Sequence, residues 1–273
     1  MSHINALICK ILWTKCLLGV TIYLIVQGEF IILYRHSKQY EIRYTDVDFS
    51  DNLKLSALLS LMEESACLSA DELGFGYSVL LPKKIGFVIA NWYIDLFRPI
   101  RLGDVLTVDT WPIKPKKLIV LRDFELYVGG EKVGVATSRW CLVDLENYAM
   151  LPSAAAFPSE LQYNDFRSVE VANFKIPEIG EKEIKYSKVV SYSDYDHNNH
   201  VNNTKYADFL LDAFSVDELK NKSVSAVRIT YVKQSKFGDT IDIYRQKQEG
   251  GSWIIEGRVG GELRVQASVK FYE

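Results

Sequence analysis

The sequence predicts an α+β protein built from two similar halves, in each of which a helix packs on an antiparallel sheet. Three observations lead to this expectation: a stretch of apolar residues at helical spacing, a following series of strand-like segments, and a second occurrence of the same order later in the chain. Apolar residues make up 48% of the 273 residues and charged residues 25%, a composition that allows a sizeable globular core.

The elements of the first half can be placed in order along the chain. Residues 38–45 alternate between polar and apolar types, as a half-buried strand does. A helix follows and ends near Gly74, and its apolar face consists of Leu55, Leu58, Leu59, Met62 and Ala66. Strands are then expected at 86–98, 104–112, 117–128 and 131–144, separated by Gly-Asp, Lys-Pro-Lys-Lys and Gly-Gly turns.

A repeat follows a connection that contains prolines. Residues 151–183 lack a clear period and are predicted to be a linker. After it the first pattern begins again, and three segments match in the same order. Tyr44-Thr-Asp-Val-Asp48 aligns with Tyr192-Ser-Asp-Tyr-Asp196, Gly103-Asp104 with Gly238-Asp239, and the run from Gly130 with the run from Gly261. These matches indicate an internal duplication.

One helix with four or five antiparallel strands is the outline of a hotdog domain, and two such domains would pair their sheets side by side. The sequence therefore predicts a tandem (double) hotdog, each half a long helix packed on a curved antiparallel sheet. The expected division is an apolar N-terminal extension at 1–34, an N-terminal hotdog at 35–150, a linker at 151–183 and a C-terminal hotdog at 184–273.

Charge and cysteine content exclude several function classes. The formal net charge of -3 disfavours a nucleic-acid-binding protein, which would carry a clear positive excess. The four cysteines form no CxxC pair and match no zinc spacing, so we expect neither a metal nor another cofactor. Because no disulfide framework is evident, a reducing compartment such as the cytoplasm is expected.

The first residues do not fit the repeat. Residues 6–26 are largely apolar, but Lys10, Thr14 and Lys15 interrupt them. The cleanest run, 16–26, has about 11 residues, whereas a membrane-spanning helix needs about 20. Three interpretations stay open: a dispensable or non-native extension, a membrane anchor, and a cleaved signal peptide that lacks a small-residue cleavage site. Membrane contact through residues 1–28 is therefore an alternative to a purely cytoplasmic location.

A dense polar segment marks the candidate active site. Asp196, Asn198 and His200 lie just ahead of the second predicted helix, which begins near Asn203. Either Asn202 or Asn203 can cap this helix. The free N–H groups and the positive end of the helix dipole would face a substrate carbonyl placed there and stabilise its developing oxyanion.

A plain Asn-rich turn is the competing interpretation of this segment, since Asn and Asp favour turns for local reasons. The first half argues against it. Asp48 matches Asp196, but Ser50 stands opposite Asn198, and Asn52 stands opposite His200. A helix cap would need little difference between the copies, whereas a site used once would differ as observed. His197 is expected to be a surface residue.

The string from Asp196 to Tyr206, which contains His200-Val-Asn-Asn203, closely resembles the signature of acyl-ACP thioesterases, the enzymes that end fatty acid synthesis in plants and many bacteria. The resemblance covers residues 36–273 and includes Ala136-Thr-Ser-Arg-Trp140. It implies that the C-terminal hotdog is catalytic through Asp196, Asn198 and His200, and that the N-terminal hotdog sets acyl-chain specificity. It also implies acyl carrier protein as the acyl donor.

One part of the family pattern is missing. The family usually carries a Glu on a later strand, followed in plant members by a Cys, and alignment places Gln234 and Ser235 there. An amide cannot accept a proton as a carboxylate does, so Gln234 is expected only to hold a water molecule. Gln234, Ser235 and Asn203 are therefore supporting candidates, while Cys67 and Cys141 are expected to be structural thiols.

Two surfaces are predicted more weakly. An apolar tunnel for the fatty acyl chain would be lined by Leu58, Leu59, Met62, Phe87, Ile89 and Trp92, although ordinary core packing explains each residue equally well. An acidic carrier protein calls for a basic docking patch, for which Lys83-Lys84 and Lys114, Lys116, Lys117 and Arg122 are available. Solvated turns are the alternative for both groups of lysines.

The chemistry leaves several choices open. Asp196 either activates water or attacks the carbonyl itself, with Asn198 and His200 orienting the reactants. The nearest rival function is an acyl-CoA thioesterase, and a third class is a non-catalytic module that binds acyl thioesters. Enoyl-thioester hydration fits less well, because its usual Asp and His spacing and proline are absent. The chain is expected to be a monomer or a homodimer.

Overall fold

The computed structural model describes residues 11–16, 19–26, 29–170, 173–180, 183–196 and 200–272. The N-terminal half contains β1 (Ile11–Cys16), β2 (Gly19–Val26), β3 (Glu29–Glu41), α1 (Leu55–Glu72), α2 (Tyr77–Leu80), β4 (Ile85–Leu96), β5 (Val105–Pro112), β6 (Ile119–Val128), β7 (Glu131–Asp144) and β8 (Met150–Leu151). The C-terminal half contains β9 (Ile184–Val189), α3 (Asn203–Leu211), α4 (Val216–Leu219), β10 (Ser223–Tyr231), β11 (Thr240–Lys247), β12 (Trp253–Val259) and β13 (Glu262–Tyr272). Short 3-10 turns occupy 44–46, 81–83, 153–156 and 192–194.

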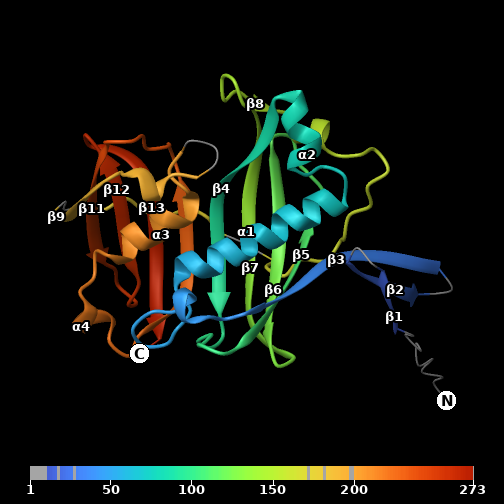
Figure 1. Cartoon of the computed structure of the whole chain (residues 1–273), viewed down its shortest axis with the longest axis horizontal. Coiled ribbons are helices and arrows are strands. Elements are labelled where there is room, and N and C mark those ends of the chain that lie inside the picture. The colour runs from blue at the N-terminus through green and yellow to red at the C-terminus, as the bar shows by residue number, and fades with distance from the viewer. Residues whose placement is uncertain are drawn as a thin grey trace, which may run out of the picture.

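The strands form one antiparallel sheet whose order is mirrored about its centre (Figure 1). Its path runs β1-β2-β3-β5-β6-β7-β4 and continues as β10-β13-β12-β11-β9, with β8 paired to β7. The two halves meet where β4 and β10 pair from Ala226↔Asp95 to Thr230↔Asn91. From β3 to β4 and from β9 to β10 the halves have the same strand order, so the predicted tandem hotdog is confirmed.

The elements predicted for the first half agree closely with the structure. The helix expected from Leu55 to near Gly74 is α1, and each of the four expected strands overlaps one of β4 to β7. The strand expected at 38–45 ends earlier, at Glu41, because Asp46 accepts hydrogen bonds from the Arg43 backbone N–H and side chain and bends the chain. The strand also starts earlier, at Glu29, so β3 continues into the segment that was expected to be an extension.

Glycine conformations repeat between the halves. Gly129 and Gly130 have φ values of 59° and 83°, and Gly260 and Gly261 have 57° and 83° in the matching turn before β13. Because these values lie in the left-handed region, both turns favour glycine. The Gly-Gly matches in the sequence therefore reflect one turn geometry used twice.

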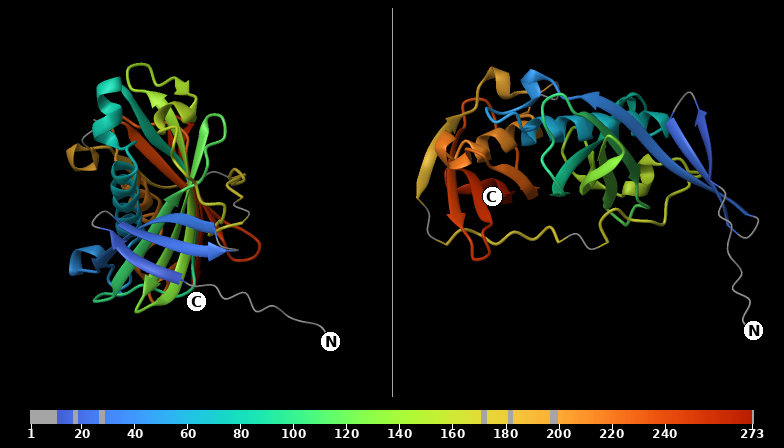
Figure 2. Two further views of the ribbon diagram at one scale, coloured as in Figure 1. Left: turned by 90° about the vertical axis from the view of Figure 1, so that its right-hand side faces the viewer. Right: turned by 90° about the horizontal axis from the view of Figure 1, so that it is seen from below.

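The helices and the linker lie on opposite faces of the sheet (Figure 2). The linker crosses the face away from α1 and α3 and forms hydrogen bonds and ion pairs with strands of both halves. Arg167 Nε lies 2.8 Å from Asp123 Oδ2 on β6, and Gln266 Nε2 on β13 donates to the Pro177 carbonyl at 2.7 Å. The segment predicted as a linker is thus a strap that joins both halves of the sheet.

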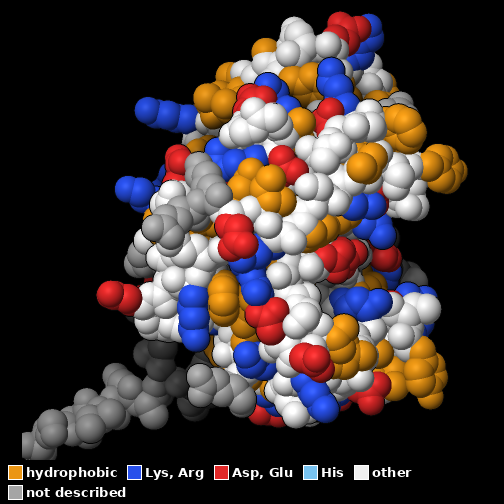
Figure 3. All heavy atoms as spheres, turned by 90° about the vertical axis from the view of Figure 1, so that its left-hand side faces the viewer, with side chains coloured by type: hydrophobic (Ala, Val, Ile, Leu, Met, Phe, Trp, Pro, Cys, Tyr) orange, Lys and Arg blue, Asp and Glu red, His pale blue; other side chains and the backbone are white. Residues whose placement is uncertain are grey.

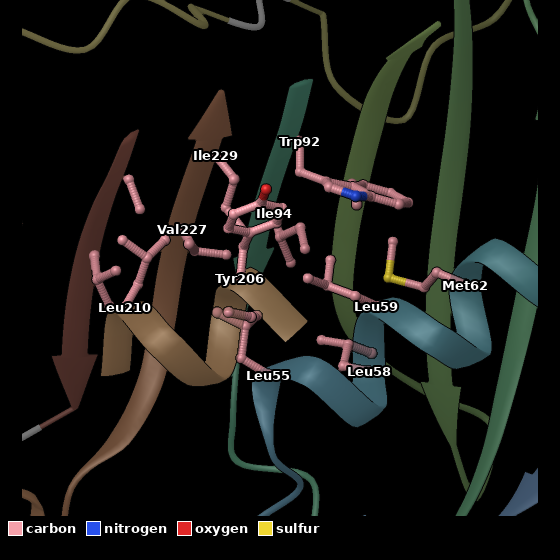
Figure 4. Close-up of a cluster of buried hydrophobic side chains, with 14 of the residues drawn as sticks. Leu55, Leu58, Leu59, Met62, Trp92, Ile94, Tyr206, Leu210, Val227 and Ile229 are labelled. Carbon is pink, nitrogen blue, oxygen red and sulfur yellow. The ribbon is translucent and has the colours of Figure 1, made fainter. Parts of the chain in front are cut away.

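A single large core lies between the helices and the sheet and continues across the junction of the halves. Leu59 and Met62 of α1 point toward Trp92 on β4, and Leu210 of α3 points toward Val227 on β10 (Figure 4). Leu59, Met62 and Trp92 are fully buried. Burial of the apolar stripe on both helices is the main reason that they lie on this face.

The N-terminal segment contributes strands. β1 pairs with β2, and β2 pairs with β3 from Val20↔Arg35 to Val26↔Glu29. Within the described part of the chain, no helix has the length and apolar character needed to cross a bilayer.

Candidate active site

The loop that carries the predicted catalytic residues is closed by backbone hydrogen bonds. Tyr195 and Val201 form a β-bridge, and the Asp196 N–H donates to the His200 carbonyl at 2.9 Å. Asp196 and His200 are both half-buried, and they therefore lie at the two ends of a short loop just ahead of α3. Asn198, the third predicted catalytic residue, lies outside the described residues, as does His197.

The first half contains the same loop without the histidine. The Asp48 N–H donates to the Asn52 carbonyl at 2.8 Å, and the Lys54 N–H donates to the Asp46 carbonyl at 2.9 Å. Asp48 Oδ1 accepts from the N–H groups of Ser50 and Asn52 at 2.8 and 3.1 Å. This carboxylate stabilises its own turn. The loop shape that the two halves share therefore has a structural reason that does not depend on catalysis.

The start of α3 is capped by Asn202. Its Oδ1 accepts from the Thr204 N–H at 2.9 Å, and its carbonyl accepts from the Lys205 N–H at 2.9 Å. Asn203 is the first helical residue, and its carbonyl accepts from the Tyr231 hydroxyl at 3.0 Å. Because the N–H groups of Thr204 and Lys205 already have acceptors, an oxyanion held at this helix end would use the N–H of Asn203.

His200 contacts a side chain of the other half. The Tyr148 hydroxyl lies 3.0 Å from His200 Nε2, and the two rings are 5.6 Å apart at an interplanar angle of 79°. Tyr148 lies in the turn between β7 and β8. The Tyr148 hydroxyl can therefore set which nitrogen of the imidazole carries the proton.

The turn that presents Tyr148 is held firmly. Tyr148 has φ 59°, a left-handed conformation that is uncommon for an aromatic residue. Asp144 Oδ1 accepts from the N–H groups of Glu146 and Asn147 at 2.8 and 3.1 Å, and Asn147 Oδ1 accepts from the Ala149 N–H at 2.8 Å. These side-chain contacts stabilise an otherwise unfavourable backbone conformation.

A second carboxyl, that of Glu63 on α1, lies close to Asp196. Burial raises the pKa of Glu63 to about 8; the neighbouring Trp92 indole acts in the opposite direction, and the charge of Asp196 adds to the rise. Glu63 Oε1 and Trp92 Nε1 are buried without a hydrogen-bond partner. A carboxyl in this setting is predominantly protonated at neutral pH.

The sequence reasoning missed both Glu63 and Tyr148. Glu63 carried a usable signal, because it lies four residues after Leu59 and three before Ala66 and so interrupts the apolar face of the helix. Tyr148 carried none, because its contact with His200 depends on how the two halves pack.

The supporting candidates have different surroundings. Ser235 is fully buried, and its backbone N–H donates to the Tyr206 hydroxyl at 3.0 Å, so its position is set by packing against α3. Gln234 is exposed beside it. The loop from 232 to 239 also reaches Tyr195, whose hydroxyl accepts from the Phe237 N–H at 2.5 Å. Gln234 therefore lies in a loop that contacts Tyr195, the residue before Asp196.

Most residues predicted to line an acyl tunnel lie in the main core. Leu58, Leu59, Met62, Ile89 and Trp92 belong to one buried cluster. Phe87 belongs to a separate cluster with Leu142 and packs against Phe157, with ring centroids 5.7 Å apart. The six residues therefore do not form one continuous lining.

The predicted docking patch requires one correction. Lys114, Lys116 and Lys117 are exposed in the β5–β6 turn, but Arg122 is 4% exposed and donates to Ser69 Oγ at 2.8 Å. Burial lowers the pKa of Arg122 to about 10. The expectation that Arg122 docks a carrier protein is wrong, because Arg122 is the fourth residue of β6 and its side chain points inward to Ser69 of α1.

Lys84 and Lys117 lie near the turn between β7 and β8 that carries Tyr148. The Lys117 carbonyl accepts from the N–H and hydroxyl of Ser153, just after β8, at 2.9 and 2.7 Å. The Lys84 carbonyl accepts from the Leu145 N–H, and its ammonium pairs with Glu146 in the Tyr148 turn. By contrast, acidic and basic side chains lie interspersed on the opposite end, formed by the C-terminal half (Figure 3).

Comparisons with known proteins agree with this arrangement. Residues 34–152 match the acyl-ACP thioesterase N-terminal domain, and residues 178–271 match the C-terminal domain. The chain is 22% identical over 234 residues to the chloroplastic oleoyl-acyl carrier protein thioesterase 1 of Arabidopsis thaliana, covering 76% of this chain and 62% of that protein. This chain therefore spans somewhat less than two thirds of the plant relative.

Two solved structures share the whole fold. An acyl-ACP thioesterase from Bacteroides thetaiotaomicron superposes with a TM-score of 0.77 at 22% identity, covering 87% of this chain and 98% of the other. The 12:0-ACP thioesterase from Umbellularia californica gives 0.75 at 17% identity, covering 87% and 97%. Because both domain matches together cover most of its length, the chain belongs to the acyl-ACP thioesterase family.

Proposed function

We propose that this protein hydrolyses the thioester of a fatty acyl group carried on acyl carrier protein and releases the free fatty acid. The observation that carries the proposal is the hydrogen-bonded loop that places Asp196 and His200 together just ahead of the N-terminus of α3. Membership of the family supplies the substrate class, and the names of the relatives point to long or medium acyl chains.

Hydrolysis needs a nucleophile, a stabilised oxyanion and a proton for the leaving thiol. In the proposed reaction Asp196 activates a water molecule or attacks the carbonyl carbon itself. Asn198 and His200 orient the reacting groups, and the Asn203 N–H at the start of α3 stabilises the oxyanion. The N-terminal half sets acyl-chain length, and the protein acts in the cytoplasm as a monomer or homodimer, with membrane contact through residues 1–28 as the alternative location.

The test compares turnover of matched variants on acyl-ACP. Asp196→Asn removes the negative charge and keeps the size of the side chain. His200→Asn introduces the residue that the first half has at the matched position, Asn52. Each substitution is expected to lower kcat by about 100-fold or more. Asp48→Asn, the same change in the first half, is the control and should retain wild-type kcat. Normal turnover by both active-site variants would disprove the assignment.

An acyl-CoA thioesterase remains the second candidate, because it differs in the carrier and shares the chemistry. Assaying one acyl chain on both carriers separates the two. A higher kcat/KM on acyl-ACP supports the proposal, and a higher value on acyl-CoA supports the rival. Tight binding of acyl-ACP with no release of fatty acid would instead indicate a non-catalytic binding module.

A further inference from the structure

The loop that carries Asp196 and His200 is approached by side chains of the other half. Tyr148 reaches His200 from the β7–β8 turn, and Glu63 of α1, whose Oε1 is buried without a hydrogen-bond partner, lies within electrostatic range of Asp196. We propose that the N-terminal half completes the active site: Tyr148 positions the His200 ring, and Glu63 supplies the proton that the leaving thiolate takes up. The inference deepens the proposed function and rests on it.

The case for Tyr148 is geometric. The Tyr148 residue is 47% exposed, and its hydroxyl lies 3.0 Å from His200 Nε2. A tyrosine in a left-handed backbone conformation carries strain that is retained where the surrounding structure requires it. When the phenol donates to Nε2, the imidazole proton is held on Nδ1, the nitrogen that faces away from Tyr148.

The case for Glu63 begins with its neighbours. α1 packs against α3, and β4 pairs with β10, so the helix that carries Glu63 extends to the junction of the halves. The charged or titratable groups that act on it or respond to it are Asp196 ahead of α3, Tyr231 on β10, and Cys67 on its own helix. Among the residues that the structure describes, no Lys, Arg or His forms an ion pair with Glu63, and Glu63 Oε1 has no hydrogen-bond partner.

Such a carboxyl suits a proton donor. Its environment favours the neutral acid, which can give a proton, whereas Asp196 opposite serves as the base or nucleophile. Gln234 occupies the place where the family pattern has a carboxylate, and an amide acts neither as an acid nor as a base near neutral pH. Glu63 thus provides the second carboxyl of the site from the other half of the chain.

The proposed step balances in protons and electrons. Asp196 accepts a proton from water as the oxygen bonds to the thioester carbon. When the tetrahedral intermediate collapses, the carbon–sulfur bond breaks, its electron pair stays with sulfur, and sulfur takes the Glu63 proton. The proton on Asp196 then returns to the Glu63 carboxylate, directly or through water, and both groups recover their starting states.

For Glu63, the decisive experiment varies the leaving group. Glu63→Gln is nearly isosteric and neutral, and on acyl-ACP its kcat should fall about 100-fold. On a thioester of an acidic aromatic thiol, which leaves without a proton, it should fall less than threefold. Glu64→Gln, the exposed neighbour on α1, is the control and should match wild type on both substrates. Equal losses of Glu63→Gln on both thioesters, or no loss, would overturn this role.

For Tyr148, the readout is the His200 ring. Tyr148→Phe should lower kcat on acyl-ACP about tenfold with little change in KM, and it should shift the ¹⁵N resonance of Nε2 away from that of a hydrogen-bonded acceptor. Tyr44→Phe removes a hydroxyl from an 85% exposed tyrosine and should change neither quantity. An unchanged Nε2 resonance and kcat in Tyr148→Phe would contradict the positioning role.

Failure of the inference can be told from failure of the proposed function. If the wild-type protein hydrolyses acyl-ACP and both variants retain its kcat, the active site is confined to the C-terminal half and the inference falls while the function stands. If the wild-type protein hydrolyses neither thioester, the function and the proton-donor role of Glu63 fall together. The Nε2 resonance still decides the contact between Tyr148 and His200.

Discussion

Glu63 shows how one buried side chain links stability to pH. Burial, helped by the charge of Asp196, raises the pKa of Glu63 from the ordinary 4.5 to about 8, so the folded state holds a proton that the unfolded state releases above pH 4.5. The contribution is fully present below about pH 4.5, declines as pH rises toward 8, and is lost above that value. The protonated Glu63 carboxyl, which we propose as the proton donor, therefore makes the folded protein less stable as the pH rises to 8 and above.

We predict that the free energy of unfolding depends on pH more steeply in the wild-type protein than in Glu63→Gln. Between pH 5 and 8 the free energy of unfolding of the wild-type protein should fall relative to that of Glu63→Gln by at most about 1.4 kcal/mol per pH unit. Denaturant titrations of both proteins at several pH values measure it. Parallel stability curves for the two proteins would mean that Glu63 is ionised in the folded state.

Arg122 is a residue whose location could not be predicted from its sequence neighbours. It follows the Lys-Pro-Lys-Lys turn closely in sequence and looks like a fourth surface cation, yet in the structure it donates to Ser69 and Thr110 under α1. Strand alternation could have warned of this, because Phe124 lies two positions later and is fully buried on the same face. The length of the turn, which decides where alternation starts, could not be read from the sequence.

At the scale of elements, the β5–β6 turn is the candidate contact for the carrier protein. Lys114, Lys116 and Lys117 are exposed there, and none of them pairs with a carboxylate among the described residues. The turn bonds to Ser153, so it is fixed beside the end of the sheet from which Tyr148 reaches His200. An acidic partner attracted by these lysines would deliver its acyl group close to the catalytic loop.

Charge reversal at Lys116 and Lys117 to Glu should raise KM for acyl-ACP about tenfold and leave kcat nearly unchanged, because docking is affected and the reacting groups are not. Small acyl thioesters without a carrier should show wild-type KM. As a control, the same reversal at Lys220 and Lys222, two exposed lysines in the turn between α4 and β10, should leave both substrates unaffected. A parallel rise for carrier-bound and carrier-free substrates would argue against docking at this turn.

Local elements and the site differ in how far the sequence determines them. The period of α1, the strand alternation and the Gly-Gly turns are local properties, so the helix, strands and repeat could be predicted from residues alone. His200 could be found because the first half has Asn52 at the matched position, and Asp196 because it begins the same polar segment ahead of the helix. Tyr148 is 52 residues from His200 in sequence, and only the pairing of β4 with β10 brings them together.

At the scale of the whole molecule, the two halves behave structurally as one unit. The main core includes Phe124 from the first half and Ile255 from the second, and Asn91 Nδ2 donates to Thr230 Oγ1 across the junction at 2.9 Å. The linker adds a third connection, since Arg167 pairs with fully buried Asp123 while Gln266 holds Pro177 further along. An active site assembled from both halves depends on this continuity.

The chain should therefore unfold in one cooperative transition despite its duplicated architecture. In scanning calorimetry we expect a single peak whose calorimetric and van't Hoff enthalpies agree. Ile255→Val in the second half and Phe124→Leu in the first should each destabilise by about 1 kcal/mol and lower that one Tm by about 2–4 °C, since a loss in either half weakens the shared core. Val189→Ala, on a 57% exposed side chain of β9, should leave Tm within about 1 °C and is the control. Two separable peaks, of which each core substitution shifts only its own, would show that the halves are independent and that their contact is too weak to hold Tyr148 and Glu63 against the catalytic loop.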